Sequence, residues 1–308
     1  MRILYLIEEL KGGGKERRLV ELLKGLTRES NYEIHLVLTK TSIDYPEVNH
    51  LPVTIHYLKG LSDLALIYHY FSLVLKLKPD VVHTWSFKTS FYISLLKPFV
   101  AFRFVVGFIG DTVGFSTISS VLANALVFRK ADIIISNSCT GLASYKVPVN
   151  KGKVIYNGFD PSRLTTIEDN RLDKLDIKTP YKVVMLANVT QFKNYKLFIE
   201  IAEAIITRRN DVTFIAIGNI LPEYAKLVDR FTENKHSRIK FLGFMHDICP
   251  LIKNCNVGLL CTYTEGISNG IMELMANGVP VITNDLNGGS KELISSGKDG
   301  IICSNSAM

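Results

Sequence analysis

The sequence lacks the short patterns that usually hold a metal ion. No Asp-x-Asp pair occurs among its 308 residues, so a pair of carboxylates for a diphosphate-bound metal ion is not evident. The five cysteines show no Cys-x-x-Cys spacing and no accompanying pair of histidines, and they stand at positions 139, 249, 255, 261 and 303. We therefore expect neither a metal site nor a bound cofactor.

A secretory signal and an unbroken membrane-spanning run are also lacking. Met1 leads directly into the apolar segment 2–7, which is too short for a signal peptide. Together with the odd number of cysteines, this favours reduced thiols and a cytoplasmic location. Lys97 and Arg103 interrupt the apolar stretch 91–109, and a charge at mid-bilayer costs about 2.5–3.5 kcal/mol. This stretch predicts a helix followed by a buried strand.

Docking on a membrane surface is a separate question. Residues 64–77 and 91–109 are rich in apolar and aromatic side chains, which either pack in a core or lie on a membrane face. The net charge of +7 falls mostly in the first half, where residues 1–160 hold 19 Lys/Arg and 13 Asp/Glu. Such a basic half suits an anionic partner such as a nucleoside diphosphate or anionic lipid, although a solvated lysine-rich surface explains it too.

Apolar runs alternate with helical patterns along the chain, which is typical of parallel sheets built from βαβ units. The first half predicts strands at 2–7, 33–38, 53–57, 80–83, 103–108, 132–136 and 153–156. After a polar stretch the pattern begins again, with strands at 182–187, 212–217, 238–241, 256–260 and 279–283. We predict an α/β fold of two Rossmann-like, doubly wound domains, 1–160 and 181–308, joined by a linker over 161–180 and facing each other across a cleft.

Glycines follow the first predicted strand, in the segment Lys11-Gly-Gly-Gly-Lys-Glu16. Gly13 and Gly14 would let the backbone approach a phosphate at the start of a helix. The dinucleotide fingerprint would place its third glycine at position 17, which is Arg17. A plain turn between strand and helix explains these residues equally well.

The strongest pattern lies between Thr264 and Glu273. A predicted strand ends near Cys261, a polar loop with glycines follows, and a helix opens near Ser268, where free N–H groups would cradle a diphosphate. Glu265 precedes that helix and Glu273 lies about a turn and a half into it. Ionised carboxylates only accept hydrogen bonds and therefore suit hydroxyl groups, although Glu273 alone would be interpreted as a solvated helix residue.

This segment resembles the sugar-donor signature of retaining GT-B glycosyltransferases, in particular glycosyltransferase family 4. That signature is a Glu, seven residues, a second Glu, a helix end of small residues and Gly-x-Pro-Val, all present here up to 278–281. The resemblance implies that Glu265 contacts hydroxyls of the donor sugar and that Glu273 contacts the nucleotide ribose. The backbone around the helix start is expected to meet the phosphates, and the donor-binding set includes Gly266, Ser268, Asn269, Gly270 and Ile271.

Residues 187–194 resemble the family's loop Gly-Arg-Leu-x-x-x-Lys-Gly, whose basic residues neutralise the diphosphate. The resemblance makes Lys193 the expected cation beside the leaving group, where a fixed charge contributes strongly to catalysis. Without the resemblance, Lys193 would be a surface lysine in a turn. Asn188 stands where the family commonly has Arg, so we expect donor binding there with weakened or redistributed phosphate contacts.

Two residues of the first half are further candidates. Family members often carry a histidine after the fifth strand, where this sequence reads Gly107-Phe-Ile-Gly-Asp111-Thr112. Asp111 is therefore a substitute candidate near the reacting centre, although Gly-Asp also favours a turn. His83 ends a predicted strand and is either an acceptor-side contact or a buried structural histidine.

The resemblance implies transfer of a sugar, with retention and without a metal ion, from a UDP- or GDP-sugar to a glycan or polyprenyl-linked acceptor. It fits the synthesis of capsule or lipopolysaccharide by a cytoplasmic enzyme at the inner membrane surface, with no role for nucleic acid. A sugar-nucleotide epimerase is one alternative. A binding module or impaired fragment is another, because look-alikes continue past position 308 through further helices, so the second domain is expected to be incomplete.

Overall fold

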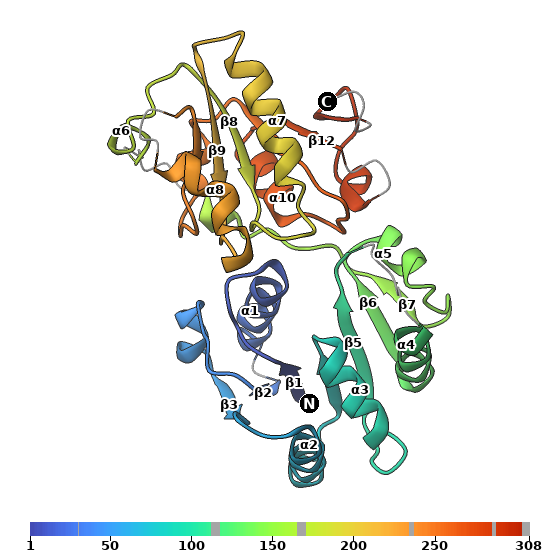
Figure 1. The fold of residues 1–308 in the computed structure, drawn as a ribbon. Coiled ribbons are helices and arrows are strands. Elements are labelled where there is room, and N and C mark those ends of the chain that lie inside the picture. Colours follow the sequence, from blue (N-terminus) through green and yellow to red (C-terminus); the bar gives the residue numbers. More distant parts are fainter. Residues whose placement is uncertain (30, 112–117, 165–170, 234–236, 285–287, 304–308) are drawn as a thin grey trace. The chain divides into compact units, whose positions relative to one another are not determined.

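The computed structural model describes residues 1–29, 31–111, 118–164, 171–233, 237–284 and 288–303 of the chain. The chain divides into two compact units, Met1–Gly158 and Phe159–Met308. Each unit has its own parallel sheet with helices between successive strands (Figure 1). The predicted α/β fold with two doubly wound domains is confirmed.

The first unit contains a seven-stranded sheet in the order β3-β2-β1-β4-β5-β6-β7. Its strands are β1 (Arg2–Ile7), β2 (Glu33–Leu38), β3 (Val53–Tyr57), β4 (Val81–Thr84), β5 (Arg103–Ile109), β6 (Ile133–Ser136) and β7 (Gly152–Val154). The chain first winds outward from β1 to β3 and then returns to the other side of β1. Such a reversal, here between β1 and β4, leaves a crevice at the carboxyl ends of the strands, where sheets of this kind bind ligands.

Helices cover both faces of the first sheet. They are α1 (Gly14–Thr27), α2 (Asp63–Leu77), α3 (Phe87–Leu96), α4 (Ile118–Lys130) and the short α5 (Cys139–Ser144), with a 3-10 turn at Pro46–His50. Ile3, Tyr5 and Ile7 pack in one core with α1, while Leu4 and Leu6 pack in a second core with α2, α3 and α4. Alternate residues of β1 therefore serve opposite faces, as a buried parallel strand requires.

The second unit repeats the plan with six strands in the order β10-β9-β8-β11-β12-β13. They are β8 (Tyr181–Leu186), β9 (Val212–Ile217), β10 (Ile239–Phe241), β11 (Val257–Leu260), β12 (Val281–Thr283) and β13 (Gly300–Ile302). Its helices are α6 (Arg171–Lys174), α7 (Tyr195–Ile206), α8 (Ala225–Thr232), α9 (Cys249–Ile252) and α10 (Asn269–Ala276). The reversal of strand order falls between β8 and β11, so the carboxyl ends of these two strands mark the crevice of this unit.

Most predicted strands lie within two residues of their expected positions. The apolar stretch 91–109 forms the end of α3 and then β5, as predicted, and no helix in the described part of the chain is long and apolar enough to cross a bilayer. α5, α6 and β13 were not predicted. Within the predicted linker 161–180, Leu172 and Ile177 are buried in the core of the second unit.

Candidate functional site

The start of α10 lies against the carboxyl end of the second sheet. Ser268 is the N-cap of this helix, and its Oγ accepts a hydrogen bond from Ile271 N–H at 3.5 Å. A Cβ on Gly270 would lie 2.3 Å from the carbonyl oxygen of Leu186, the last residue of β8. Only glycine therefore lets the helix begin this close to the central strand. The first turn of such a helix presents backbone N–H groups that have no intrahelical partners.

The loop before α10 is held on its other side by residue 289. Gly289 N–H donates to Glu265 O at 3.0 Å, and a Cβ on Gly289 would lie 2.5 Å from the backbone of Gly266. Gly289 is the first residue of the 3-10 turn Gly289–Glu292, so the backbone of this turn packs closely against the backbone of the loop before α10. The predicted residues Gly266, Ser268, Asn269, Gly270 and Ile271 therefore form one loop and helix start with a fixed shape.

Lys193 and Glu265 meet in an ion pair between Nζ and Oε2. The pairing follows from the backbone, because Asn194 N–H donates to Cys261 O and Tyr263 N–H donates to Phe192 O, each at 3.0 Å. The two charged side chains are only 17% and 14% exposed. The structure thus brings together the predicted phosphate cation and the predicted sugar-binding carboxylate, 72 residues apart in the sequence.

Glu273 is buried rather than solvated, with 6% of its surface exposed. Its Oε1 accepts a hydrogen bond from Arg163 Nη2 at 2.8 Å, and the Arg163 guanidinium carbon lies 5.4 Å from the centre of the Phe159 ring. A buried carboxylate needs such a partner, because leaving water without one costs several kcal/mol. Sequence reasoning missed Arg163, since it lies within the segment predicted as a linker.

Asn188 connects the loops that follow β8 and β9. Its Oδ1 accepts a hydrogen bond from Asn219 N–H at 2.9 Å. The preceding Gly218 has φ +156, and a Cβ there would lie 2.2 Å from Ala187 O. The amide oxygen of Asn188 therefore fixes the backbone at the carboxyl edge of the sheet. Its predicted donor contact stays a prediction.

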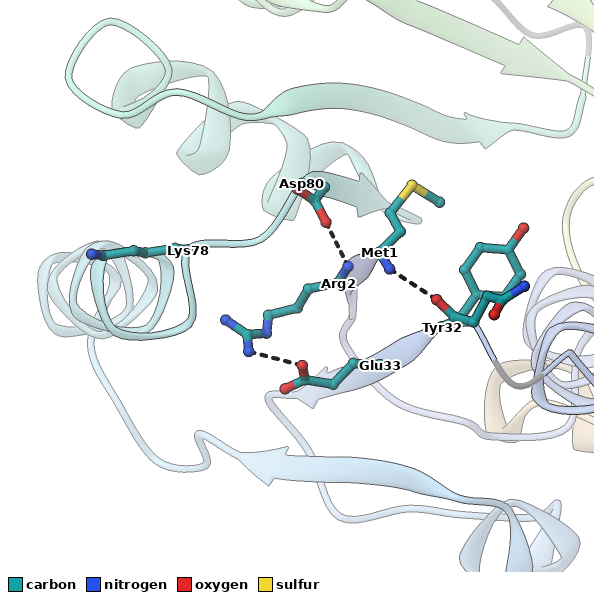
Figure 2. Close-up of a pocket in the computed structure, with 7 residues that line it drawn as sticks. Met1, Arg2, Tyr32, Glu33, Lys78 and Asp80 are labelled. Carbon is teal, nitrogen blue, oxygen red and sulfur yellow. Dashed lines mark hydrogen bonds and ion pairs between the residues drawn. The ribbon is translucent and has the colours of Figure 1, made fainter.

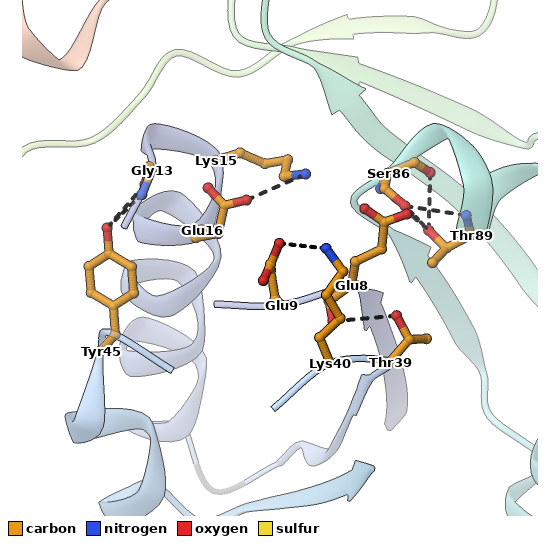
Figure 3. Close-up of polar contacts among 10 residues, drawn as sticks. All are labelled: Glu8, Glu9, Gly13, Lys15, Glu16, Thr39, Lys40, Tyr45, Ser86 and Thr89. Atoms are coloured by element: carbon orange, nitrogen blue, oxygen red, sulfur yellow. Dashed lines mark hydrogen bonds and ion pairs between the residues drawn. The ribbon is translucent and has the colours of Figure 1, made fainter. Parts of the chain in front are cut away.

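The glycine loop of the first unit is bonded within that unit (Figure 3). Gly12 N–H donates to Asp44 Oδ2 at 2.7 Å, Gly13 N–H donates to Tyr45 Oη at 3.3 Å, and the Tyr45 hydroxyl donates to Gly13 O at 3.1 Å. The Glu16 carboxylate folds over Gly13, where a Cβ would lie 2.3 Å from its Oε2. The N–H groups of Gly12 and Gly13 thus have protein partners, and the phosphate contacts of Gly13 and Gly14 stay predictions.

The two other candidates of the first unit lie at the ends of β4 and β5. Asp111 Oδ1 accepts a hydrogen bond from the Tyr145 hydroxyl at 2.9 Å, and burial followed by the Asp111 charge raises the pKa of Tyr145. Thr112 lies outside the described residues. The His83 ring lies 5.3 Å from the ring of Tyr5 and 5.1 Å from that of Trp85. Burial, and then the charge of Arg18, lower the pKa of His83 to about 3, so this ring is neutral at physiological pH.

A pocket of about 500 Å³ lies at the opposite, amino end of the first sheet (Figure 2). Figure 2 shows Arg2 bonded to two of its lining residues, through its N–H to Asp80 Oδ2 at 2.7 Å and through Nη2 to Glu33 Oε2 at 2.8 Å. Its charged lining is thus largely paired internally. Within the described ranges, no group of three or more His, Cys, Asp or Glu side chains is arranged to hold a metal ion.

Known families match the chain in two parts. A family model described as Glycosyltransferase Family 4 matches residues 12–163, and one described as Glycosyl transferases group 1 matches residues 180–308. The second match contains the ion pair of Lys193 and Glu265, the start of α10 and Glu273.

Two distant relatives match over most of the chain. The capsular polysaccharide biosynthesis glycosyltransferase CapH of Staphylococcus aureus is 22% identical over 301 residues, which are 93% of this chain and 82% of that protein. The UDP-Gal:alpha-D-GlcNAc-diphosphoundecaprenol alpha-1,3-galactosyltransferase of Escherichia coli is 25% identical, over 88% of this chain and 79% of that protein. Among solved structures, Anabaena HepE in complex with UDP and glucose matches with a TM-score of 0.86 and 21% identity, over 99% of this chain and 86% of that chain. At this identity, the structural match shows the fold alone.

Proposed function

This chain is a family 4-like glycosyltransferase with the GT-B fold, and we propose that it transfers a sugar from a UDP-sugar to a lipid-linked glycan during cell-surface polysaccharide synthesis. Support for the donor comes from HepE, which was solved with UDP. Support for the acceptor comes from the Escherichia coli relative, which is named for a diphosphoundecaprenol acceptor.

The observation that carries the proposal is the group of charges around the start of α10. Lys193 and Glu265 form an ion pair in the loops next to the helix start, and Glu273 is a buried residue of the helix itself. In the proposed complex the helix start and Lys193 bind the diphosphate, Glu265 accepts from hydroxyls of the sugar, and Glu273 accepts from the ribose. Arg163 fixes the carboxylate of Glu273 so that it is already oriented before the nucleotide binds.

We propose that transfer proceeds with retention and without a metal ion. Charge accumulates on the diphosphate as the bond to the sugar breaks, and a fixed ammonium group beside it lowers the barrier. Lys193 supplies that charge. The acceptor hydroxyl attacks from the face that the diphosphate leaves, and the departing phosphate takes up the proton of that hydroxyl.

We further propose that the first unit docks on the cytoplasmic membrane surface, which delivers a lipid-linked acceptor. The support is a row of exposed apolar side chains on α2 and α3, in which Leu64 is 81% exposed and Phe99, just beyond α3, is 76% exposed. Exposed apolar patches of this kind mark protein or membrane contacts, and nearby lysines attract anionic lipid.

The main test is transfer by the isolated protein, supplied with membranes and a panel of UDP- and GDP-sugars. We expect one UDP-sugar to be consumed. Lys193→Met should lower the rate of transfer by roughly 100- to 1,000-fold, as expected for the loss of one group that stabilises developing charge. Lys196→Met removes the same charge from an 82% exposed side chain on α7 and should leave the rate unchanged.

Binding measurements test the roles within the site. Glu273→Gln keeps an acceptor for Arg163 but loses the charge, so UDP should bind roughly 10-fold more weakly while inorganic pyrophosphate is unaffected. Unchanged affinity for UDP would remove the ribose assignment. A protein that binds and consumes none of the sugar nucleotides, or that isomerises one without an acceptor, would contradict the proposed transfer.

A further inference from the structure

Arg18 is a cation at the carboxyl edge of the first sheet that has no acidic partner among the described residues. It lies in the second turn of α1 and is only partly exposed, and among the described residues it makes no hydrogen bond or ion pair. The nearest acidic influence is Glu16, whose carboxylate is paired with Lys15 at 3.5 Å. Burial lowers the pKa of Arg18 to about 10, so the guanidinium is still charged at neutral pH. Such a charge costs free energy unless something compensates it.

Trp85 lies beside this guanidinium, at the end of β4. The Arg18 guanidinium carbon is 5.5 Å from the centre of the Trp85 ring, close enough for a cation–π contact. Trp85 itself is 6% exposed, and its indole N–H has no hydrogen-bond partner in the described part of the structure. The neighbouring His83 also has an unpartnered nitrogen, Nε2, which faces Gly107.

The position of Arg18 and Trp85 in the fold favours the binding of a ligand. Trp85 directly follows the last residue of β4, and Gly110 directly follows the last residue of β5. A Cβ at position 110 would lie 3.2 Å from Arg18 Nη2, so glycine keeps the space beside the guanidinium clear of a side chain. These residues lie at the carboxyl ends of strands next to the β1–β4 reversal, where doubly wound sheets bind ligands.

The chemistry of the group selects an anion. A guanidinium and an indole N–H are both donors with no acceptor atom, and guanidinium matches phosphate oxygens in pairs. We propose that Arg18 and Trp85 form a phosphate site for the acceptor, which binds the diphosphate joining the lipid to the glycan. This inference rests on the proposed function for its ligand. The diphosphate of the sugar donor has the same chemistry and is the alternative source.

The chain offers a direct reporter, because Trp85 is its only tryptophan. We expect the emission of Trp85 to change when the full chain is titrated with geranyl diphosphate, a short soluble prenyl diphosphate, and not with geraniol. Arg18→Gln should weaken this binding by 10-fold or more. Arg28→Gln, which removes the same charge from the exposed end of α1, should not. Thermal melting by circular dichroism establishes that both variants are folded.

Two further variants separate the contribution of the guanidinium of Arg18 from that of the indole N–H of Trp85. Arg18→Lys keeps the charge but not the planar fork and should restore only part of the binding. Trp85→Phe keeps an aromatic ring beneath Arg18 and loses the N–H, so calorimetry should show binding of geranyl diphosphate weakened several-fold. In the transfer assay, Arg18→Gln should raise the KM for the lipid-linked acceptor and leave the KM for the sugar donor unchanged.

Several results would overturn the assignment. The first is that the emission of Trp85 does not change with geranyl diphosphate. The second is that the Arg18 and Arg28 variants bind this ligand equally well. The third is that Arg18→Gln loses affinity for UDP instead of affinity for the prenyl diphosphate. The last outcome would give the site to the donor. Calorimetry with UDP on the Glu273 variant tests the proposed function separately, so a failure at Arg18 is distinguishable from a failure of the donor site.

Discussion

A few buried and partly buried charges determine most of the chemistry of this molecule. Glu273 has Arg163 and Lys193 has Glu265, so these two charges of the second unit each have a partner of opposite sign. Arg18 in the first unit has none among the described residues. Paired charges hold their own geometry before a ligand arrives, whereas an unpaired one gains most from an anionic ligand.

His83 gives a prediction for stability at acid pH. Its pKa is about 3 in the folded chain and about 6.5 in the unfolded chain, so between these values the unfolded state binds more protons. The free energy of unfolding should therefore fall as pH decreases below 6.5, by up to about 1.4 kcal/mol per pH unit from this residue. Tyr5, Trp85 and Arg18 surround the ring, and none of them gains a proton in this range.

The measurement is urea unfolding at pH 7, 6 and 5, followed by Trp85 fluorescence. His83→Gln cannot take up the proton, so its stability relative to the unchanged chain should improve by roughly 2 kcal/mol between pH 7 and pH 5. His50→Gln, at an exposed position, is the matched control and should not reproduce this improvement. If the free energy of unfolding changed equally with pH for the unchanged chain and for His83→Gln, His83 would not be protonated on unfolding.

Residues of the candidate site could be proposed from the sequence where the signal was local. Glu265 and Glu273 stand eight residues apart around one helix start, and Lys193 lies in a loop of recognisable pattern. Arg163 was not predictable, because 110 residues separate it from Glu273 and only the fold brings them together. The same holds for Asp44 and Tyr45, which bond the N–H groups of the glycine loop from 32 residues away.

At the scale of elements, runs of apolar residues located most strands, because buried parallel strands are apolar on both faces. The pattern missed some short elements, among them the six-residue α5 and the three-residue β13, in which few residues are available to show a period. Periodicity also did not distinguish a helix that is buried on all sides from a helix that exposes apolar side chains. α3 is a helix of the second kind, since Phe87 and Leu95 are exposed.

α2 and α3 each carry exposed apolar side chains, and we call these side chains together the α2–α3 row. On α2 it contains Leu64, Tyr68 and Leu75, and along α3 and just beyond it contains Phe87, Leu95 and Phe99. Lys88 Nζ bonds Asp63 Oδ1 at 2.8 Å, which places the starts of the two helices side by side. The two helices therefore run in the same direction, and both start at the carboxyl edge of the sheet.

The α2–α3 row should bind anionic membranes. Leu64→Ser combined with Phe99→Ser should reduce binding to phosphatidylcholine–phosphatidylglycerol vesicles by at least about 10-fold, because burying either side chain in lipid contributes about 1.5–3 kcal/mol. High salt should weaken binding further, since the exposed Lys76 and Lys78 lie at the end of α2. Sedimentation with vesicles measures this.

Val149→Ser combined with Ile155→Ser removes comparable exposed apolar surface elsewhere in the first unit and serves as the control. If both pairs of substitutions reduced vesicle binding equally, the effect would belong to general surface hydrophobicity rather than to the α2–α3 row. If the unchanged chain formed dimers through this face instead, light scattering of the Leu64 and Phe99 variant would show the loss of dimers, and the membrane assignment would be wrong.

At the scale of the whole molecule, each unit has its own sheet and its own buried core. Among the described residues, the second unit has one core cluster from Leu172 to Ile294, and the first has two clusters on the faces of its sheet. Units built in this way can unfold one at a time. The only tryptophan, Trp85, belongs to the first unit, so fluorescence reports on that unit alone while far-ultraviolet circular dichroism reports on both.

These facts predict how UDP should change unfolding in urea. Because the proposed nucleotide contacts Lys193, Glu265 and Glu273 all belong to the second unit, UDP should stabilise that unit, by about 2.7 kcal/mol at 100 times its Kd. The circular dichroism transition should then shift to higher urea while the Trp85 transition stays in place. Glu273→Gln should reduce the shift at the same UDP concentration. Fluorescence and circular dichroism transitions that coincide and move together with UDP would instead show that the two units unfold as one, and that the nucleotide stabilises both.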